Sequence, residues 1–212
     1  METTLIVPGL YGSELQHWQS WIERKLLNSV RVEQEEWDNP ILPIWADTII
    51  RYIDNHPGKI WIIAHSFGCL ASVFAANKRP ERIAGAMLVA PANPGCFNMN
   101  GFQAGEVYIN AIDSISLKLP KTNLGFPSVV VASTNDPWMT LDNAYKWAEH
   151  WDSHFINIGA AGHINVASGF GAWPKGLEIF ESLRQSQQYL PLGIITEDGS
   201  YPRPTPDHPS NH

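Results

Sequence analysis

Short runs of hydrophobic residues alternate along the chain with stretches in which hydrophobic residues recur at helical spacing. The apolar runs predict strands at residues 4–7, 30–32, 60–64, 83–90, 128–132 and 155–158. The helical spacing predicts helices at residues 17–27, 43–53, 69–77, 141–151 and 175–184. Residues 60–64 are apolar at every position, as expected for a parallel strand that is covered on both faces. This alternation predicts an α/β fold with a mostly parallel sheet of about six strands and helices on both faces.

Two segments interrupt the alternation. Residues 92–127 are irregular and rich in Asn, Gly and Pro, with a helical stretch around residues 107–115. We expect this segment to form a short cap at one end of the sheet. The end of the chain, residues 186–212, is rich in proline and predicts an extended, poorly ordered tail. Residues 1–185 are expected to fold as one domain.

Composition and charge narrow the classes of function. The 212 residues carry a formal net charge of −7, which disfavours nucleic-acid binding because such proteins need a basic surface. The sequence has no window that approaches the roughly 18 uninterrupted apolar residues of a membrane span, and no basic segment of a signal peptide at its start. Cys69 and Cys96 lack the spacing of a metal site and are too few for a disulfide framework. We therefore expect a cytoplasmic protein that binds neither membrane nor nucleic acid; its oligomeric state is not predicted.

Ser66 lies at a junction between a predicted strand and a predicted helix. The surrounding residues, Ala64-His65-Ser66-Phe67-Gly68, follow the pattern G-x-S-x-G of a nucleophile elbow, with Ala in place of the first Gly. In such an elbow the serine adopts a strained backbone conformation so that its hydroxyl projects above the sheet. The positions two before and two after it must be small, because strand and helix cross closely there. Ser66 is therefore the candidate nucleophile.

A serine nucleophile needs a base, and the base needs a carboxylate that orients it. In an α/β-hydrolase fold the chain order is Ser, then Asp or Glu, then His, with both partners in loops after later strands. Asp136 follows the predicted strand 128–132, and His163 follows the predicted strand 155–158. The sequence therefore predicts a catalytic triad of Ser66, Asp136 and His163 in a compact α/β-hydrolase domain.

The predicted chemistry is acyl transfer through an acyl-enzyme. Backbone N–H groups must stabilise the oxyanion, and the expected donors are Phe67, directly after the nucleophile, and Leu10 in the loop after the first strand. This chemistry requires no metal and no organic cofactor. Residues expected to line the pocket are Tyr11, His17, His65 and Trp138. His17 could equally cap the first helix, and His65 could equally be packed behind the pocket.

Several stretches together resemble the small serine hydrolases related to retinoblastoma-binding protein 9 and the bacterial YdeN-type proteins. The matching stretches include residues 7–10, His17-Trp18-Gln19-x-Trp21, residues 64–68, 89–91, 132–137 and 159–165, with 168–176 similar to the bacterial branch. The resemblance covers about residues 3–184. It implies that Ser66, Asp136 and His163 occupy the family's catalytic positions. The Leu-x-Cys-x-Glu motif of retinoblastoma binding is absent from the sequence, so that partnership is not implied.

A cap of 36 residues (127 − 92 + 1) is too small for the deep tunnel of a large lipase. It offers Phe97, Met99, Phe102, Tyr108 and Ile109 as apolar walls. We therefore expect small, moderately apolar ester substrates, with amides or thioesters as alternatives. Two other interpretations remain open. The chain could be a regulatory binding protein that keeps the fold, or the triad could serve C–C bond cleavage or perhydrolysis.

Overall fold

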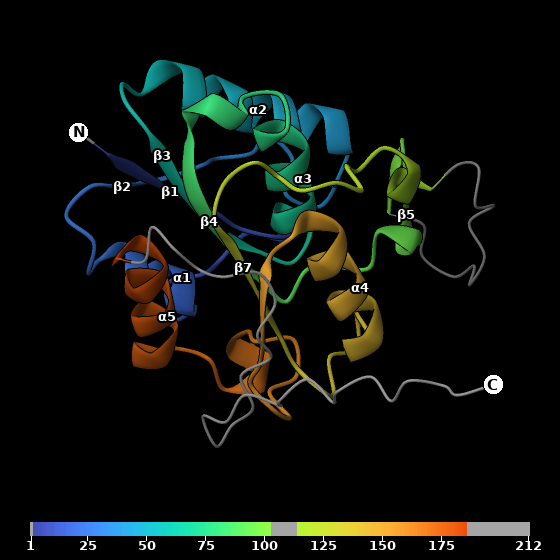
Figure 1. Cartoon of the computed structure of the whole chain (residues 1–212). Coiled ribbons are helices and arrows are strands. Elements are labelled where there is room, and N and C mark those ends of the chain that lie inside the picture. The colour runs from blue at the N-terminus through green and yellow to red at the C-terminus, as the bar shows by residue number, and fades with distance from the viewer. Residues whose placement is uncertain (1, 103–113, 186–212) are drawn as a thin grey trace, which may run out of the picture.

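The computed structural model describes residues 2–102 and 114–185, which form a central parallel sheet between two layers of helices (Figure 1). Its six strands have the order β2-β1-β3-β4-β7-β8, and every neighbouring pair is parallel. The strands are β1 (Thr3–Val7), β2 (Ser29–Arg31), β3 (Ile60–His65), β4 (Ile83–Val89), β7 (Ser128–Ala132) and β8 (His154–Asn157). The predicted fold class is therefore confirmed.

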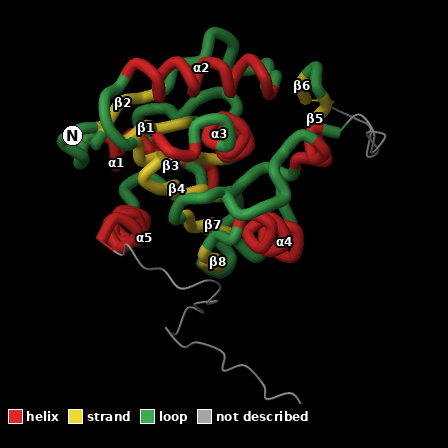
Figure 2. The backbone as a smooth tube through the Cα atoms, turned by 45° about the horizontal axis from the view of Figure 1, so that its top comes forward, coloured by secondary structure: helices red, strands yellow, loops and turns green. Residues whose placement is uncertain are grey.

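Side chains of the central strands alternate between the two faces of the sheet, and each face has its own core. Leu5, Val7 and Ile62 pack beneath α2 (Leu42–Asn55), α3 (Phe67–Ala76) and α4 (Leu141–Trp151). Ile6 and Ile63 on the opposite face pack against α1 (Trp18–Glu23) and α5 (Pro174–Gln185). The backbone trace in Figure 2 shows α2 and α5 on opposite sides of the sheet. Because helices cover both faces, the central strands β3, β4 and β7 are almost entirely apolar.

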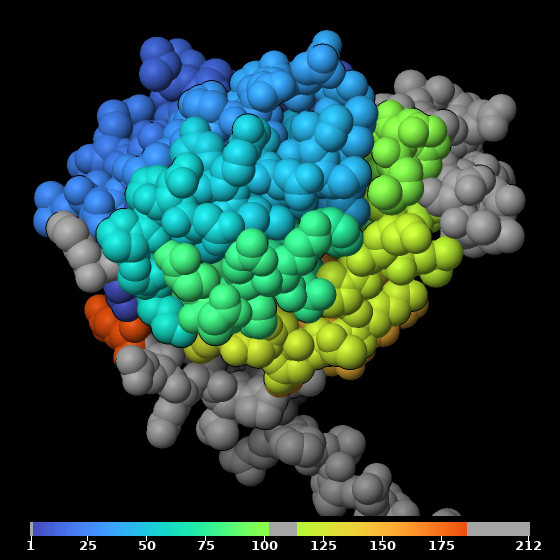
Figure 3. Space-filling view, turned by 90° about the horizontal axis from the view of Figure 1, so that it is seen from above, coloured from blue at the N-terminus to red at the C-terminus, as the bar shows by residue number. Residues whose placement is uncertain are grey.

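The space-filling view shows α2 as a continuous outer surface on its side of the molecule (Figure 3). This helix is amphipathic: Trp45, Ile49 and Ile53 are buried, whereas Ile44 is half exposed. Pro43 lies in its first turn, where a missing N–H costs no hydrogen bond. The helix begins one residue before the predicted start at Pro43, and the pattern identifies Trp45, Ile49 and Ile53 as buried but wrongly places Ile44 with them.

The structure differs from the predicted elements most in two places, and the other boundaries agree to within two residues. Helix α1 ends at Glu23, although hydrophobic spacing predicts helix as far as Leu27, because the chain turns there to enter β2. The predicted cap contains a two-stranded hairpin, β5 (Phe97–Asn98) and β6 (Gly101–Phe102), and short 3-10 helices at Pro94–Cys96 and Ile115–Leu117. Two further 3-10 helices are formed by Pro80–Arg82 and Val166–Ser168. The helical stretch around residues 107–115 falls largely, and the tail at 186–212 wholly, outside the described residues.

The strand order places the carboxyl ends of β1 and β3 side by side at the point where the topology changes direction. From β1 the chain first moves outward to β2, and then returns past β1 to β3. Loops that leave neighbouring strands in opposite directions open a crevice at such a point, where ligands of open α/β sheets bind. The predicted nucleophile directly follows β3, so the topology places Ser66 at this crevice.

Candidate active site

Ser66 forms a sharp turn between β3 and α3. Its backbone angles, φ 54° and ψ −128°, are strained for a residue with a side chain. The N–H of Ser66 donates to the carbonyl of Val89 at 3.1 Å, and the N–H of Cys69 donates to the carbonyl of Ser66 at 3.0 Å. The neighbouring strand and the first turn of α3 thus hold the strained conformation that the sequence motif predicts.

Two glycines let the backbone segments around the nucleophile touch. A Cβ atom on Gly68 would lie 2.3 Å from the carbonyl oxygen of Pro8 and 2.7 Å from that of Val7. A Cβ atom on Gly9 would lie 2.7 Å from Cβ of Ser66. These three distances are too short for any side chain, so the end of β1 crosses directly against the elbow. This explains why the elbow needs glycine after the serine.

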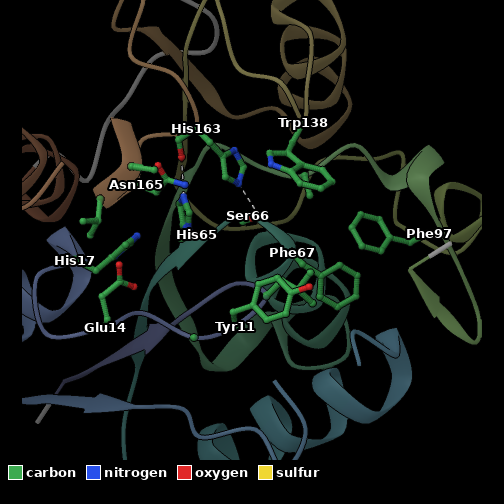
Figure 4. Close-up of a pocket in the computed structure, with 15 residues that line it drawn as sticks. Tyr11, Glu14, His17, His65, Ser66, Phe67, Phe97, Trp138, His163 and Asn165 are labelled. Carbon is green, nitrogen blue, oxygen red and sulfur yellow. Dashed lines mark hydrogen bonds between the residues drawn. The ribbon is translucent and has the colours of Figure 1, made fainter. Parts of the chain in front are cut away.

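The structure brings the three predicted triad residues into one hydrogen-bonded chain (Figure 4). Nε2 of His163 lies 2.9 Å from Oγ of Ser66, and Nδ1 of His163 lies 2.9 Å from both carboxylate oxygens of Asp136. The Asp136 side chain is 3% exposed and also accepts a hydrogen bond from the N–H of Trp138 at 2.8 Å. The Asp136 carboxylate therefore requires the proton of His163 on Nδ1, which leaves Nε2 free to accept from the serine hydroxyl.

The backbone around His163 is strained and held by side chains from the first half of the chain. Gly162 and Ile164, on either side of His163, both have positive φ, 56° and 48°. The indole N–H of Trp18 donates to the carbonyl of Ile164 at 2.8 Å. Nε2 of His65 lies 2.9 Å from the carbonyl oxygen of His163 and donates to it. Trp18 and His65 thus fix the loop that aims the imidazole at Ser66.

Side chains also connect the loop of His163 with the loop of Asp136. The hydroxyl of Ser133 accepts from the N–H of Ala161 at 2.9 Å, and Oδ1 of Asn135 accepts from the N–H of Gly162 at 2.7 Å. Ser133 and Asn135 belong to the segment that carries Asp136. These hydrogen bonds link the two loops and hold the carboxylate at a fixed distance from the imidazole.

The predicted oxyanion donors, Leu10 and Phe67, both line the cavity above Ser66. Phe67 is the first residue of α3, so its N–H has no carbonyl within the helix to pair with. Within residues 2–102 and 114–185, neither N–H has a hydrogen-bond partner. Both groups are therefore free to donate to a bound substrate.

The cavity has a volume of about 250 Å³, and its two sides differ in chemistry (Figure 4). All predicted site residues line it except Asp136, which lies behind His163. Trp138, 41% exposed, and Tyr11 lie at its aromatic side, whereas His17 and His65 are buried at its opposite side. His17 also performs its alternative predicted role, because Nδ1 accepts from the N–H of Gln19 at the start of α1.

Burial keeps both of these histidines neutral at neutral pH. Desolvation, reinforced by the charges of Arg31 and His163, lowers the pKa of His17 to about 4. Desolvation, reinforced by His163 and His17, lowers the pKa of His65 well below its usual value. Each ring therefore carries one proton, and its hydrogen-bond partner determines which nitrogen holds it.

Sequence reasoning missed four contributors to the site. Glu14 and Asn165 line the cavity, but nothing in the sequence distinguishes them from ordinary loop residues. Trp18 lies on the apolar face of α1, so the sequence pattern predicts a core residue and no role at the site. Its indole N–H nevertheless needs an acceptor when it is buried, and that acceptor is in the loop of His163. Ser168 fixes the Asn165 amide, since its N–H and hydroxyl both donate to Oδ1 at 3.0 Å.

Residues 2–102 and 114–185 contain no group of three or more His, Cys, Asp or Glu side chains placed to hold a metal ion. None of the helices in these ranges has the length and apolarity to cross a membrane.

Comparisons with known proteins identify relatives of this chain. The family model described as "Serine hydrolase" matches residues 4–182. The hydrolase YdeN of Bacillus subtilis is 24% identical over 187 residues, which cover 84% of this chain and 93% of that protein. A YdeN-like hydrolase from Pectobacterium atrosepticum is 35% identical, with a TM-score of 0.75 over 87% of this chain and 91% of that structure.

A more distant structure extends the agreement on the fold. An α/β superfamily hydrolase from Oenococcus oeni is 12% identical, with a TM-score of 0.64 over 88% of this chain and 94% of that structure. The predicted resemblance is thus confirmed on its YdeN side, and the relation to retinoblastoma-binding protein 9 stays a prediction.

Proposed function

The chain belongs to the serine hydrolase family, with YdeN-like hydrolases among its relatives, and from this premise we propose that it hydrolyses small carboxylic esters through an acyl-enzyme on Ser66. The substrate is a small molecule, since the cavity of about 250 Å³ lies below the range of drug-sized pockets. We place the activity in the cytoplasm.

The mechanism uses the hydrogen-bonded chain from Ser66 to Asp136. Oγ of Ser66 attacks the ester carbonyl carbon while Nε2 of His163 takes the hydroxyl proton. The carbonyl π electrons move to oxygen, which accepts hydrogen bonds from the N–H groups of Leu10 and Phe67. Collapse of the intermediate breaks the bond to the leaving oxygen, and His163 gives that oxygen its proton.

Water completes the cycle by the same steps in reverse. His163 removes a proton from a water molecule, and the hydroxide attacks the acyl carbon. The bond to Oγ breaks, Ser66 regains its proton from His163, and the carboxylic acid leaves. Throughout, Asp136 accepts a hydrogen bond from Nδ1–H and stabilises the positive charge that His163 carries in both transition states.

The observation that carries this proposal is the distance of 2.9 Å between Nε2 of His163 and Oγ of a serine in a strained elbow. The test is hydrolysis of p-nitrophenyl butyrate by the wild type and by Ser66→Ala. We expect the variant to lose about 10⁶-fold in kcat, as for other triad serines. Equal rates in the two proteins would reject the proposal and favour a binding protein that keeps the fold.

A further inference from the structure

The cavity above Ser66 has an aromatic wall and a polar wall (Figure 4). The aromatic wall consists of Phe97 and Trp138, with the ring of Phe67 packed 4.8 Å from that of Phe97. The polar wall consists of Glu14, His17, His65 and Asn165 on the other side of Ser66. The two walls would suit a substrate with one apolar and one hydrogen-bonding end.

His17 contributes a hydrogen-bond donor to the polar wall. Nδ1 of His17 accepts from the N–H of Gln19 at 3.2 Å, so this nitrogen carries no proton. The proton of the neutral ring is therefore on Nε2. Within the described ranges Nε2 has no partner, although the His17 side chain is almost fully buried at the cavity. A substrate oxygen is a suitable acceptor for it.

His65 and Asn165 extend this wall with an acceptor and a second donor. Nε2–H of His65 donates to the carbonyl of His163, so Nδ1 of the neutral ring is an acceptor. The N–H and hydroxyl of Ser168 both donate to Oδ1 of Asn165, which leaves the Nδ2 amino group of Asn165 as a donor. Neither Nδ1 of His65 nor Nδ2 of Asn165 has a partner among the described residues.

The charge of the wall selects the class of ligand. His17 and His65 are neutral, and Glu14 is the remaining ionisable side chain of this wall. The described cavity lining contains no Lys or Arg that could pair with a substrate carboxylate or phosphate. Hydroxyl groups fit this wall because each hydroxyl both donates and accepts a hydrogen bond.

The position of His163 indicates which end of the ester meets the polar wall. The leaving oxygen must receive its proton from Nε2 of His163, so the leaving group starts beside this ring. The ring of His65 lies 4.9 Å from that of His163, whereas the ring of Trp138 lies 6.3 Å away. The leaving alcohol therefore continues along the polar wall, and the acyl group lies toward Phe97.

We propose, on the basis of the function proposed above, that the preferred substrates are esters of short apolar acids with polyhydroxylated alcohols, whose hydroxyl groups bind Nε2 of His17, Nδ1 of His65 and Nδ2 of Asn165. This preference separates the protein from esterases that recognise the acyl chain alone.

The test compares 2,3-dihydroxypropyl butyrate with propyl butyrate. The two esters share the acyl group and the carbon count, so they form the same acyl-enzyme and differ by two hydroxyl groups. The measured quantity is the ratio of their kcat/KM values, divided by the ratio of their alkaline hydrolysis rates. We expect the wild type to prefer the dihydroxypropyl ester by about tenfold or more, from two hydrogen bonds of ordinary strength.

Two variants withdraw a donor from the wall and keep its structural partner. His17→Asn retains a side-chain oxygen for the N–H of Gln19, because Asn is a favourable N-cap residue, and its shorter side chain holds the amino donor nearer the backbone than Nε2 of His17. Asn165→Asp retains the oxygen that binds Ser168 and replaces the amino donor by a carboxylate oxygen. Each should lower the ratio about fivefold. The matched control His150→Asn changes an exposed histidine on α4 and should keep the wild-type ratio.

The outcomes separate this inference from the proposed function. A corrected ratio near one in the wild type would overturn the inference, and so would a ratio that His17→Asn and Asn165→Asp leave unchanged. Hydrolysis of p-nitrophenyl butyrate without cleavage of the dihydroxypropyl ester would also overturn it, while the esterase function stands. If the wild type hydrolysed none of p-nitrophenyl butyrate, 2,3-dihydroxypropyl butyrate and propyl butyrate, the proposed function itself would be rejected.

Discussion

The contact between Gly68 and the end of β1 predicts that the smallest side chain will disturb both folding and catalysis. In Gly68→Ala the new methyl group would lie 2.3 Å from the carbonyl oxygen of Pro8 and 2.7 Å from that of Val7. Both oxygens belong to the backbone and cannot rotate away. Overpacking of this kind costs about 1–3 kcal/mol. In a protein of 212 residues each kcal/mol lowers Tm by about 2–4 °C, so Tm should fall by about 2–12 °C. The elbow must also shift relative to β1, and a displacement of about 1 Å at reacting groups costs about 100-fold in rate.

The assay is thermal unfolding followed by circular dichroism, together with kcat for p-nitrophenyl butyrate well below Tm. Gly95→Ala is the matched control, because its new methyl group would meet only the flexible side chain of Asn93 at 3.2 Å. We expect this control to change Tm by less than about 2 °C, as most surface substitutions do. If Gly68→Ala matched Gly95→Ala in both Tm and kcat, the argument that close backbone contact builds the elbow would be wrong.

Three further predictions concern the groups that hold the site in place. Asp136→Asn should lower kcat about 10⁴-fold, measured with p-nitrophenyl butyrate, because His163 then loses the acceptor that fixes its tautomer; a loss under tenfold would contradict this role. Trp18→Phe leaves the buried carbonyl of Ile164 without its donor, so urea unfolding should show a loss of about 1–3 kcal/mol, and kcat should fall at constant KM. His17 has a pKa of about 4 in the folded protein and 6.5 in the unfolded chain. As pH falls, His17 is therefore protonated in the unfolded chain before it is protonated in the folded protein, and this favours unfolding. The free energy of unfolding should therefore drop by about 3 kcal/mol between pH 6.5 and 4, and urea titrations should show a shallower pH dependence in His17→Asn.

The sequence predicts the fold well where hydrophobic runs are long and covered on both faces. The strand Ser128–Ala132 and the helix Leu141–Trp151 begin and end in the structure at the predicted residues. The prediction extends α1 too far because Leu26 continues its apolar spacing, whereas the structure uses this residue in the turn toward β2. The hairpin of β5 and β6 has only two residues per strand, which is too short for any periodic pattern.

The candidate triad was predictable because its chemistry fixes both residue types and chain order. Ser66, Asp136 and His163 each follow a predicted strand, and a parallel sheet brings the carboxyl ends of its strands to one edge. The polar wall was not predictable in the same way. Which nitrogen of His17 faces a substrate depends on its contact with Gln19, and such a contact exists only in three dimensions.

Covalent labelling tests the central claim most directly. A fluorophosphonate reacts preferentially with an activated serine, and mass spectrometry of the digested protein locates the adduct. We predict a single adduct on Ser66 in the wild type, no adduct in Ser66→Ala, and labelling slowed by several orders of magnitude in His163→Ala. Gly95→Ala should be labelled like the wild type, which controls for the effect of substitution itself. An unlabelled wild-type protein, or an adduct on another serine, would contradict the assignment of Ser66 as the nucleophile.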